Sequence, residues 1–99
     1  MTDSSMQSVL MEALVDGDVQ AFERIYDLLS VLTYEICRHH LDSEAAADEA
    51  MHGLWLYIWQ NAAMLSSYGD SPWAIITATA EHHAQFHATT ERIARTAVS

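Results

Sequence analysis

The chain has 99 residues, which is enough for one domain with a modest apolar core. Its three glycines and one proline are too few for the turns of a β-protein, so the composition favours an all-α bundle. Fourteen acidic residues, four arginines and no lysine give a net charge of −10, which disfavours strong nonspecific binding to nucleic acid.

The charge is uneven along the chain. Residues 1–50 carry eleven acidic residues and two arginines, a net charge of −9, whereas residues 51–99 carry three acidic residues and two arginines, a net charge of −1. The first half should therefore attract a basic protein surface.

The cysteine usage and the hydropathy pattern bear on the compartment. Cys37 is the only cysteine, so no intrachain disulfide can form, and its apolar surroundings predict a buried thiol. The chain has neither a basic-then-apolar leader nor an apolar run long enough to cross a membrane. These features predict a protein of the reducing cytoplasm with no membrane partner.

The first elements expected are a disordered segment at residues 1–5 and a short helix over residues 6–15. Gly17 suits the left-handed position after that helix, and Asp18 can cap the next one. Residues 19–40 then repeat apolar side chains with the helical period. They predict a long helix.

Two histidines, His39 and His40, close that helix, where positive charge suits the helix dipole. After a short break, Ser43 can cap a second long helix over residues 44–64. This helix contains the run Leu54–Asn61, which reads Leu-Trp-Leu-Tyr-Ile-Trp-Gln-Asn.

The aromatic run should provide much of the core. Trp55, Ile58 and Trp59 share one helix face, and Trp73 is expected to pack against the two tryptophans. After a loop over residues 65–70, Ser71-Pro72 begins a last helix that reaches about Arg95. The short connections predict antiparallel neighbours. The result is one helical domain over residues 6–96, followed by a tail at 97–99.

This ordered pattern resembles region 2 of bacterial sigma factors of the extracytoplasmic-function (ECF) type. The resemblance rests on Gly17-Asp18, Ala21-Phe22, Ile25-Tyr26-Asp27, the run Leu54–Trp59 and Ser71-Pro72, with the family's spacing between them. It covers nearly the whole chain and implies a sigma region 2-like bundle of three main helices plus a short N-terminal helix.

The resemblance also implies two kinds of partner. In the family, the second long helix docks on the clamp helices of the RNA polymerase β′ subunit. The last helix and the loop before it open and read the −10 promoter element. A further domain, region 4, reads the −35 element, and this chain ends where the linker to region 4 would begin, so no region 4 is expected in it.

The chain departs from the family where DNA would be held. Around residues 81–89 the family carries several arginines, whereas this chain reads Glu-His-His-Ala-Gln-Phe-His-Ala-Thr. Because affinity for DNA scales with the cations that neutralise phosphates, the last helix should bind DNA weakly or only with a partner. The residues that would still face nucleic acid are Tyr68, His82, His83, His87 and Arg92.

The face of the second long helix that docks on polymerase in the family departs less from the family pattern. The family's Gln-Glu pair before its aromatic run is replaced by His52-Gly53, whereas acidic residues remain at Asp48 and Glu49. The protein-binding residues implied by the resemblance are Asp48, Glu49, His52 and Tyr57.

Other chemistries find little support in the sequence. His83 and His87, four residues apart, could supply two zinc ligands, but no further ligand with suitable spacing is identifiable, so no metal or other cofactor is expected. Asp48 and Glu49 point about 100° apart on a helix and do not form a catalytic pair. No Ser-His-Asp or Cys-His pattern has supporting spacing, and no enzyme is expected.

Two functions therefore stay open. The first is a sigma-like transcription-initiation regulator that acts by protein contact, with an anti-sigma factor or RNA polymerase core as its partner. The second is region 2 of a divergent ECF sigma factor that binds the β′ clamp and the −10 element. A small metal-binding helical protein is a distant third, and exposed aromatic residues on the second long helix would equally support a homodimer.

Overall fold

The computed structural model describes residues 2–69 and 71–98, with side chains described from residue 5 to residue 96 apart from residue 70. The described residues form five helices and no strand, which confirms the predicted all-α bundle. The helices are α1 (Thr2–Val15), α2 (Val19–His40), α3 (Glu44–Gln60), α4 (Ala62–Ser66) and α5 (Pro72–Val98).

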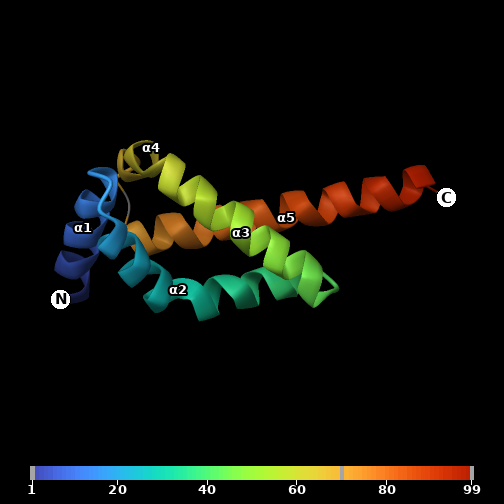
Figure 1. Cartoon of the computed structure of the whole chain (residues 1–99), viewed down its shortest axis with the longest axis horizontal. Coiled ribbons are helices and arrows are strands. Elements are labelled where there is room, and N and C mark those ends of the chain that lie inside the picture. The colour runs from blue at the N-terminus through green and yellow to red at the C-terminus, as the bar shows by residue number, and fades with distance from the viewer. Residues whose placement is uncertain (1, 70, 99) are drawn as a thin grey trace.

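The three long helices are stacked in an elongated bundle. Helices α2 and α3 form an antiparallel hairpin, α5 packs against both of them, and α1 and α4 close the end where α5 begins (Figure 1). The molecule measures 50 × 22 × 22 Å along its principal axes. The later part of α5 projects past the turn between α2 and α3, which contributes to the long dimension (Figure 1).

The predicted helix caps at Gly17, Asp18 and Ser43 are confirmed. Gly17 ends α1 with a φ of 85°, a left-handed value that glycine adopts without a side-chain clash. The Asp18 carboxylate accepts hydrogen bonds from the backbone N–H groups of Gln20 and Ala21, at 2.9 and 3.3 Å. The Ser43 hydroxyl accepts one from Ala46 N, at 3.1 Å. These bonds satisfy donors that have no partner within the first helical turn.

Several predicted boundaries were wrong. Helix α1 already begins at Thr2, so the expected disordered segment does not extend through residues 2–5; residue 1 lies outside the described part. No Gly or Pro precedes Gly17, so the sequence offers no helix breaker there. At the other end, α5 continues to Val98, into the expected tail at 97–99.

The second long helix is also shorter than predicted, because it breaks at Asn61. The Asn61 backbone leaves the helical conformation, with φ −118° and ψ 24°, and its side-chain Nδ2 donates to Tyr57 O at 3.0 Å. The chain then turns into the short helix α4, so Leu65, predicted to open the loop, is a buried helical residue.

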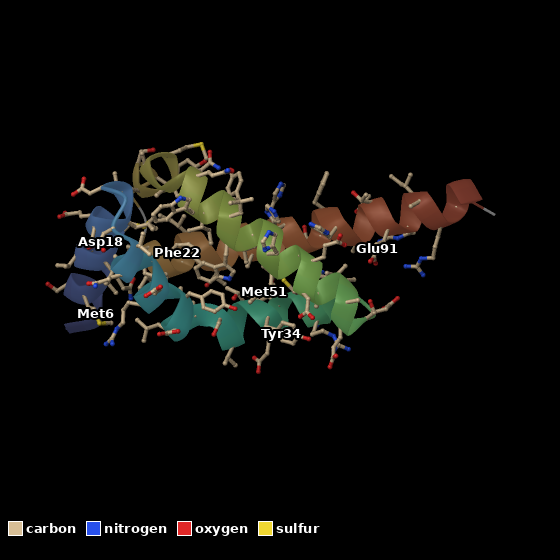
Figure 2. The ribbon with its side chains drawn as sticks, in the orientation of Figure 1. Met6, Asp18, Phe22, Tyr34, Met51 and Glu91 are labelled. Carbon is tan, nitrogen blue, oxygen red and sulfur yellow. The ribbon has the colours of Figure 1, made fainter. Side chains whose placement is uncertain are left out.

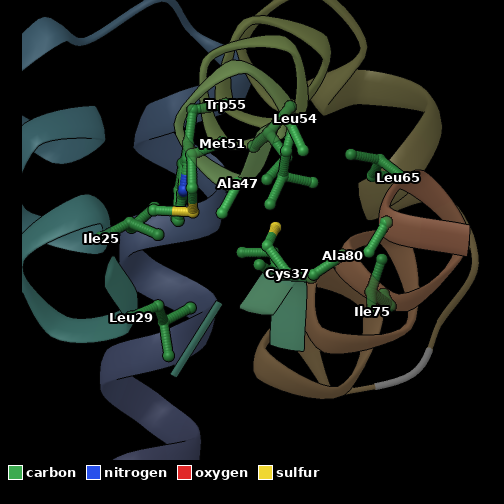
Figure 3. Packing of buried hydrophobic residues seen from close by; sticks show 14 of the residues in the cluster. Ile25, Leu29, Cys37, Ala47, Met51, Leu54, Trp55, Leu65, Ile75 and Ala80 are labelled. Carbon is green, nitrogen blue, oxygen red and sulfur yellow. The ribbon is translucent and has the colours of Figure 1, made fainter. Parts of the chain in front are cut away.

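The core lies where α2, α3 and α5 meet (Figure 3). Ile25, Leu54, Ile58 and Ile76 are fully buried. Small residues let the helices approach closely, and they are buried on both α3 and α5. They are Ala46, Ala47, Ala50, Ala80 and Ala84. Cys37 is buried among these helices, and burial raises the pKa of its thiol.

The aromatic face of α3 is partly as predicted. Trp55 is buried and Trp59 is half-buried against the core. Trp73 also packs against the core, yet among the described rings it makes no close ring contact with Trp55 or Trp59, so that predicted cluster was wrong. Instead, Trp73 N and Ser71 Oγ each donate a hydrogen bond to the Gln7 side chain of α1.

Candidate functional site

Aromatic rings from two helices meet between α2 and α3. Phe22 packs edge-to-face against both tryptophans of α3, with ring centroids 6.0 Å from Trp55 and 5.2 Å from Trp59. Tyr26 makes the same kind of contact with Trp55, at 5.1 Å. These rings hold α2 and α3 at a fixed separation, and such pairs each stabilise by about 0.5–1.5 kcal/mol beyond area burial.

A groove of about 760 Å³ runs along this α2–α3 seam. Figure 2 shows Phe22, Met51 and Tyr34 along it. Much of its lining is apolar, and two of the large lining side chains stay open to solvent in the free chain, Tyr26 at 40% and Leu56 at 47%. An open apolar groove of this size matches the volume of known binding sites.

The groove has an acidic rim. Glu23 and Asp27 line it from α2, and Asp48 lines it from α3. Neither Arg nor Lys is among its described lining residues, and His52 is the only basic side chain there. The rim therefore presents uncompensated negative charge over an aromatic floor. This arrangement favours a positively charged ligand group.

One buried donor lies beside this groove without a partner. Among the described residues, Trp55 Nε1 has no hydrogen-bond acceptor and is shielded from solvent. Leaving such a donor unpaired costs about 1–3 kcal/mol. Trp55 is thus held by its ring packing, not by a hydrogen bond.

The four residues predicted to bind protein do not form one patch. Asp48 and His52 line the α2–α3 groove, and Glu49 is exposed on α3 outside it. Tyr57 lies on the opposite flank of α3, against His83 of α5, with ring centroids 5.6 Å apart. Asp48 and Tyr57 are nine positions apart, which at about 100° per residue places them on opposite sides of a helix.

Sequence reasoning missed the contribution of α2 to this surface. The apolar repeat over residues 19–40 predicted the helix but gave Tyr26 no surface role, whereas its side chain is 40% exposed and lines the groove with Tyr34. A signal was present: Glu23, Asp27 and Tyr34 recur at spacings of four and seven, which puts them on one stripe beside the buried face.

A second hollow, of about 600 Å³, lies between α3, the loop before α5, and α5 itself. Of the residues predicted to face nucleic acid, Tyr68, His82 and His83 line it. Phe86, which the sequence reasoning did not single out, also lines it and is 64% exposed. Its position three and four residues after the two histidines was the available signal. The hollow combines flat rings with little charge.

The other two predicted residues lie outside this hollow. His87 stacks on His83, with ring centroids 5.9 Å apart. Arg92 lies farther along α5, near Ile93, and does not line the hollow. The structure therefore brings together three of the five residues and leaves the only arginine of the set apart from them.

Of the histidines of α5, His83 and His87 are half-buried and His82 is exposed. Burial, and then the neighbouring charges of His87 and His82, hold the pKa of His83 below its ordinary value of 6.5. Glu81 does not join these histidines, because it pairs with His40 of α2, at 2.7 Å from Nε2 to Oε1. No group of three or more His, Cys, Asp or Glu is placed to hold a metal ion within residues that the structure describes.

Helix α5 carries little positive charge. It contains Arg92 and Arg95 against Glu81 and Glu91, and Arg95 lies 3.9 Å from Glu91. Its formal charge, with histidines neutral, is therefore zero over 27 residues. A surface of this kind has few cations to neutralise phosphates.

Comparison of the chain with protein-family models, with characterised proteins and with solved structures finds no match. Over the described part of the chain, none of the helices combines the length and hydropathy needed to cross a membrane.

Proposed function

We propose that this chain is a sigma region 2-like regulatory module that acts by contact with a basic protein surface. Its partner would be an anti-sigma factor, so that a true sigma factor is released, or the β′ subunit of RNA polymerase. On this proposal the chain has weak or no DNA binding of its own. The helical order and the sequence pattern from Gly17 to Pro72 support the sigma-like assignment.

The observation that carries the proposal is the difference in charge between the surfaces on the two sides of α3. One flank opens onto the groove rimmed by Glu23, Asp27 and Asp48. The other faces α5, whose acidic and basic residues cancel. A module that held promoter DNA would need cations on α5, whereas contact with a basic protein needs the acidic rim that is present.

The direct test is a pull-down with the tagged full chain against purified core RNA polymerase and the anti-sigma factors of the same organism. A stable complex with either partner, weakened by raised salt, supports the proposal, because attraction between opposite charges is screened by salt. Failure to retain any of these partners at low salt would contradict it.

A second candidate function is a divergent sigma region 2 that binds the −10 element. The observation that favours it is the hollow where Tyr68, His82 and Phe86 present exposed rings, since bases stack on such rings in single-strand binders. Fluorescence anisotropy with single-stranded −10 DNA at low salt tests it. Submicromolar binding that is lost in Tyr68→Ala, but kept in Tyr34→Ala, a change at a tyrosine of α2 that lines the other groove, would favour this function over the first.

A further inference from the structure

We propose that the α2–α3 groove seats an amphipathic helix of a partner protein, with apolar side chains on its buried face and arginine or lysine on the flanks of that face. This inference rests on the proposed function, which requires a basic protein partner, and adds where and how that partner binds. The site includes residues of α2, so it differs from the α3 face expected from the sequence alone.

The shape of the groove suits a helix. Its lining on α2 extends from Val19 to Tyr34, and the fifteen steps between these residues rise about 22 Å along the helix axis, or about four helical turns. Helices dock in such grooves through apolar anchors spaced three, four and seven residues apart. The groove is lined by two antiparallel helices, so side chains of a third helix can pack between them.

The floor offers apolar anchor points that the chain itself leaves uncovered. Val19, Tyr26 and Leu56 line the groove with exposed fractions of 57%, 40% and 47%. Beneath them Phe22 and Trp55 are fixed by edge-to-face packing. In protein interfaces, a few central residues contribute most of the binding free energy, and aromatic side chains are enriched among them. The floor of this groove has the same composition.

The charge of the rim identifies the occupant. Carboxylates stand on both walls, Glu23 and Asp27 on α2 and Asp48 on α3, and no Arg or Lys among the described lining residues offsets them. A second copy of this chain would bring its own charge of −10 and only four arginines to the groove. The basic side chains of a partner helix would pair with the rim carboxylates, and its apolar side chains would cover the floor.

The test uses fluorescein-labelled helical peptides of about 18 residues, long enough to form a few helical turns. One peptide carries a Leu/Phe face flanked by arginines. A second keeps that face and replaces the arginines with glutamates, and a third has the composition of the first in an order without an amphipathic face. Binding to the full chain is followed by anisotropy and by tryptophan emission, to which Trp55 and Trp59 of the groove contribute together with Trp73.

Paired variants separate the groove from general attraction to an acidic protein. Asp27→Lys with Asp48→Lys reverses two rim charges, and Glu12→Lys with Glu35→Lys makes the same change at exposed positions outside the groove. We expect the rim pair to weaken binding of the arginine peptide about tenfold, and the control pair by less than about threefold. Leu56→Ser should also weaken it, whereas Leu28→Ser, at a similarly exposed leucine that does not line the groove, should not.

Equal losses in the rim and control pairs, equal binding of the three peptides, or no binding of the arginine peptide would overturn the inference. So would dimerisation of the chain that Leu56→Ser abolishes, because the occupant would then be a second copy. The pull-down distinguishes failure of this inference from failure of the proposed function. If the pull-down partner is still retained by the Asp27→Lys, Asp48→Lys variant, the protein contact stands and the groove is not its site.

Discussion

Gly53 of α3 faces His83 of α5, and a β-carbon placed on Gly53 would lie 3.5 Å from His83 Nε2. The next contact, with His87 Nε2, would be at 3.8 Å. Both are ordinary van der Waals separations. The backbone of Gly53 is not among those with positive φ, so neither space nor conformation requires glycine at this point in the helix.

The first prediction is that Gly53→Ala stabilises the chain. Replacing a mid-helix glycine reduces the entropy lost on folding, so the free energy of unfolding should rise by about 0.5–1 kcal/mol in urea titrations. Gly17→Ala is the matched control. It should lower the free energy of unfolding, because Gly17 has a φ of 85°, which alanine adopts only with strain. A destabilised Gly53→Ala would mean that the two histidines approach α3 more tightly than these distances indicate.

The second prediction concerns pH. The pKa of His83 lies below 6.5 in the fold, so the folded state binds fewer protons there than the unfolded state once the pH falls through 6.5. Stability should therefore decline as the pH drops through 6.5 towards the lowered pKa, and the contribution of neutral His83 is fully present above that window.

Urea titrations of the parent chain and His83→Phe at about pH 7.5 and about pH 5.5 measure this effect. The variant cannot take up a proton at residue 83, so it should gain stability relative to the parent at the lower pH. His52→Gln, at an exposed histidine, controls for the loss of an imidazole. An unchanged difference between parent and His83→Phe at the two pH values would refute the prediction.

Local signals made much of the fold predictable. Asp18 and Ser43 accept the backbone hydrogen bonds expected of helix caps, and Gly17 has the left-handed backbone expected of it. The break at Asn61 was not predictable in this way, because apolar side chains at Ala62 and Leu65 continue the helical pattern. Both are buried in α4, which packs against α1, so tertiary contacts decide where the chain turns.

The candidate site was predictable only in part, for a related reason. The sequence placed Asp48 and His52 on an exposed side of α3, and they are exposed there. The groove also needs Asp27 and Tyr26 of α2, and which residues of α2 lie opposite Asp48 depends on the register between the two helices. That register is fixed by contacts such as Tyr26 on Trp55, which no local pattern specifies.

The third prediction tests the core. Ile76 of α5 is fully buried, whereas Ile93 of the same helix is 63% exposed. Ile76→Ala should lower the free energy of unfolding by about 2–5 kcal/mol through lost burial and a residual cavity. Ile93→Ala should change it by less than about 0.5 kcal/mol. Similar effects of the two changes in urea titrations would show that the projecting part of α5 is covered in solution.

The fourth prediction concerns Gln7, whose side chain joins α1 to the start of α5. Its Oε1 accepts hydrogen bonds from Ser71 Oγ at 2.7 Å and from Trp73 N at 3.3 Å. It thus satisfies a backbone donor in the first turn of α5, the role usually taken by the residue just before a helix. Gln7→Ala should lower the free energy of unfolding by about 1 kcal/mol, as measured by thermal unfolding followed by circular dichroism. Gln85→Ala, at an exposed position of α5, should leave it close to that of the parent.

Gln7→Glu then separates the hydrogen bonds from simple packing. A carboxylate keeps both acceptor bonds and adds negative charge at the N-terminus of α5, where the helix dipole stabilises it. The stability of this variant should therefore equal or exceed that of the parent at neutral pH, and the gain should shrink on acidification as the carboxylate takes up a proton. If Gln7→Glu lost as much stability as Gln7→Ala, the side chain would act through its volume, and the link between α1 and α5 would not depend on the acceptor atom.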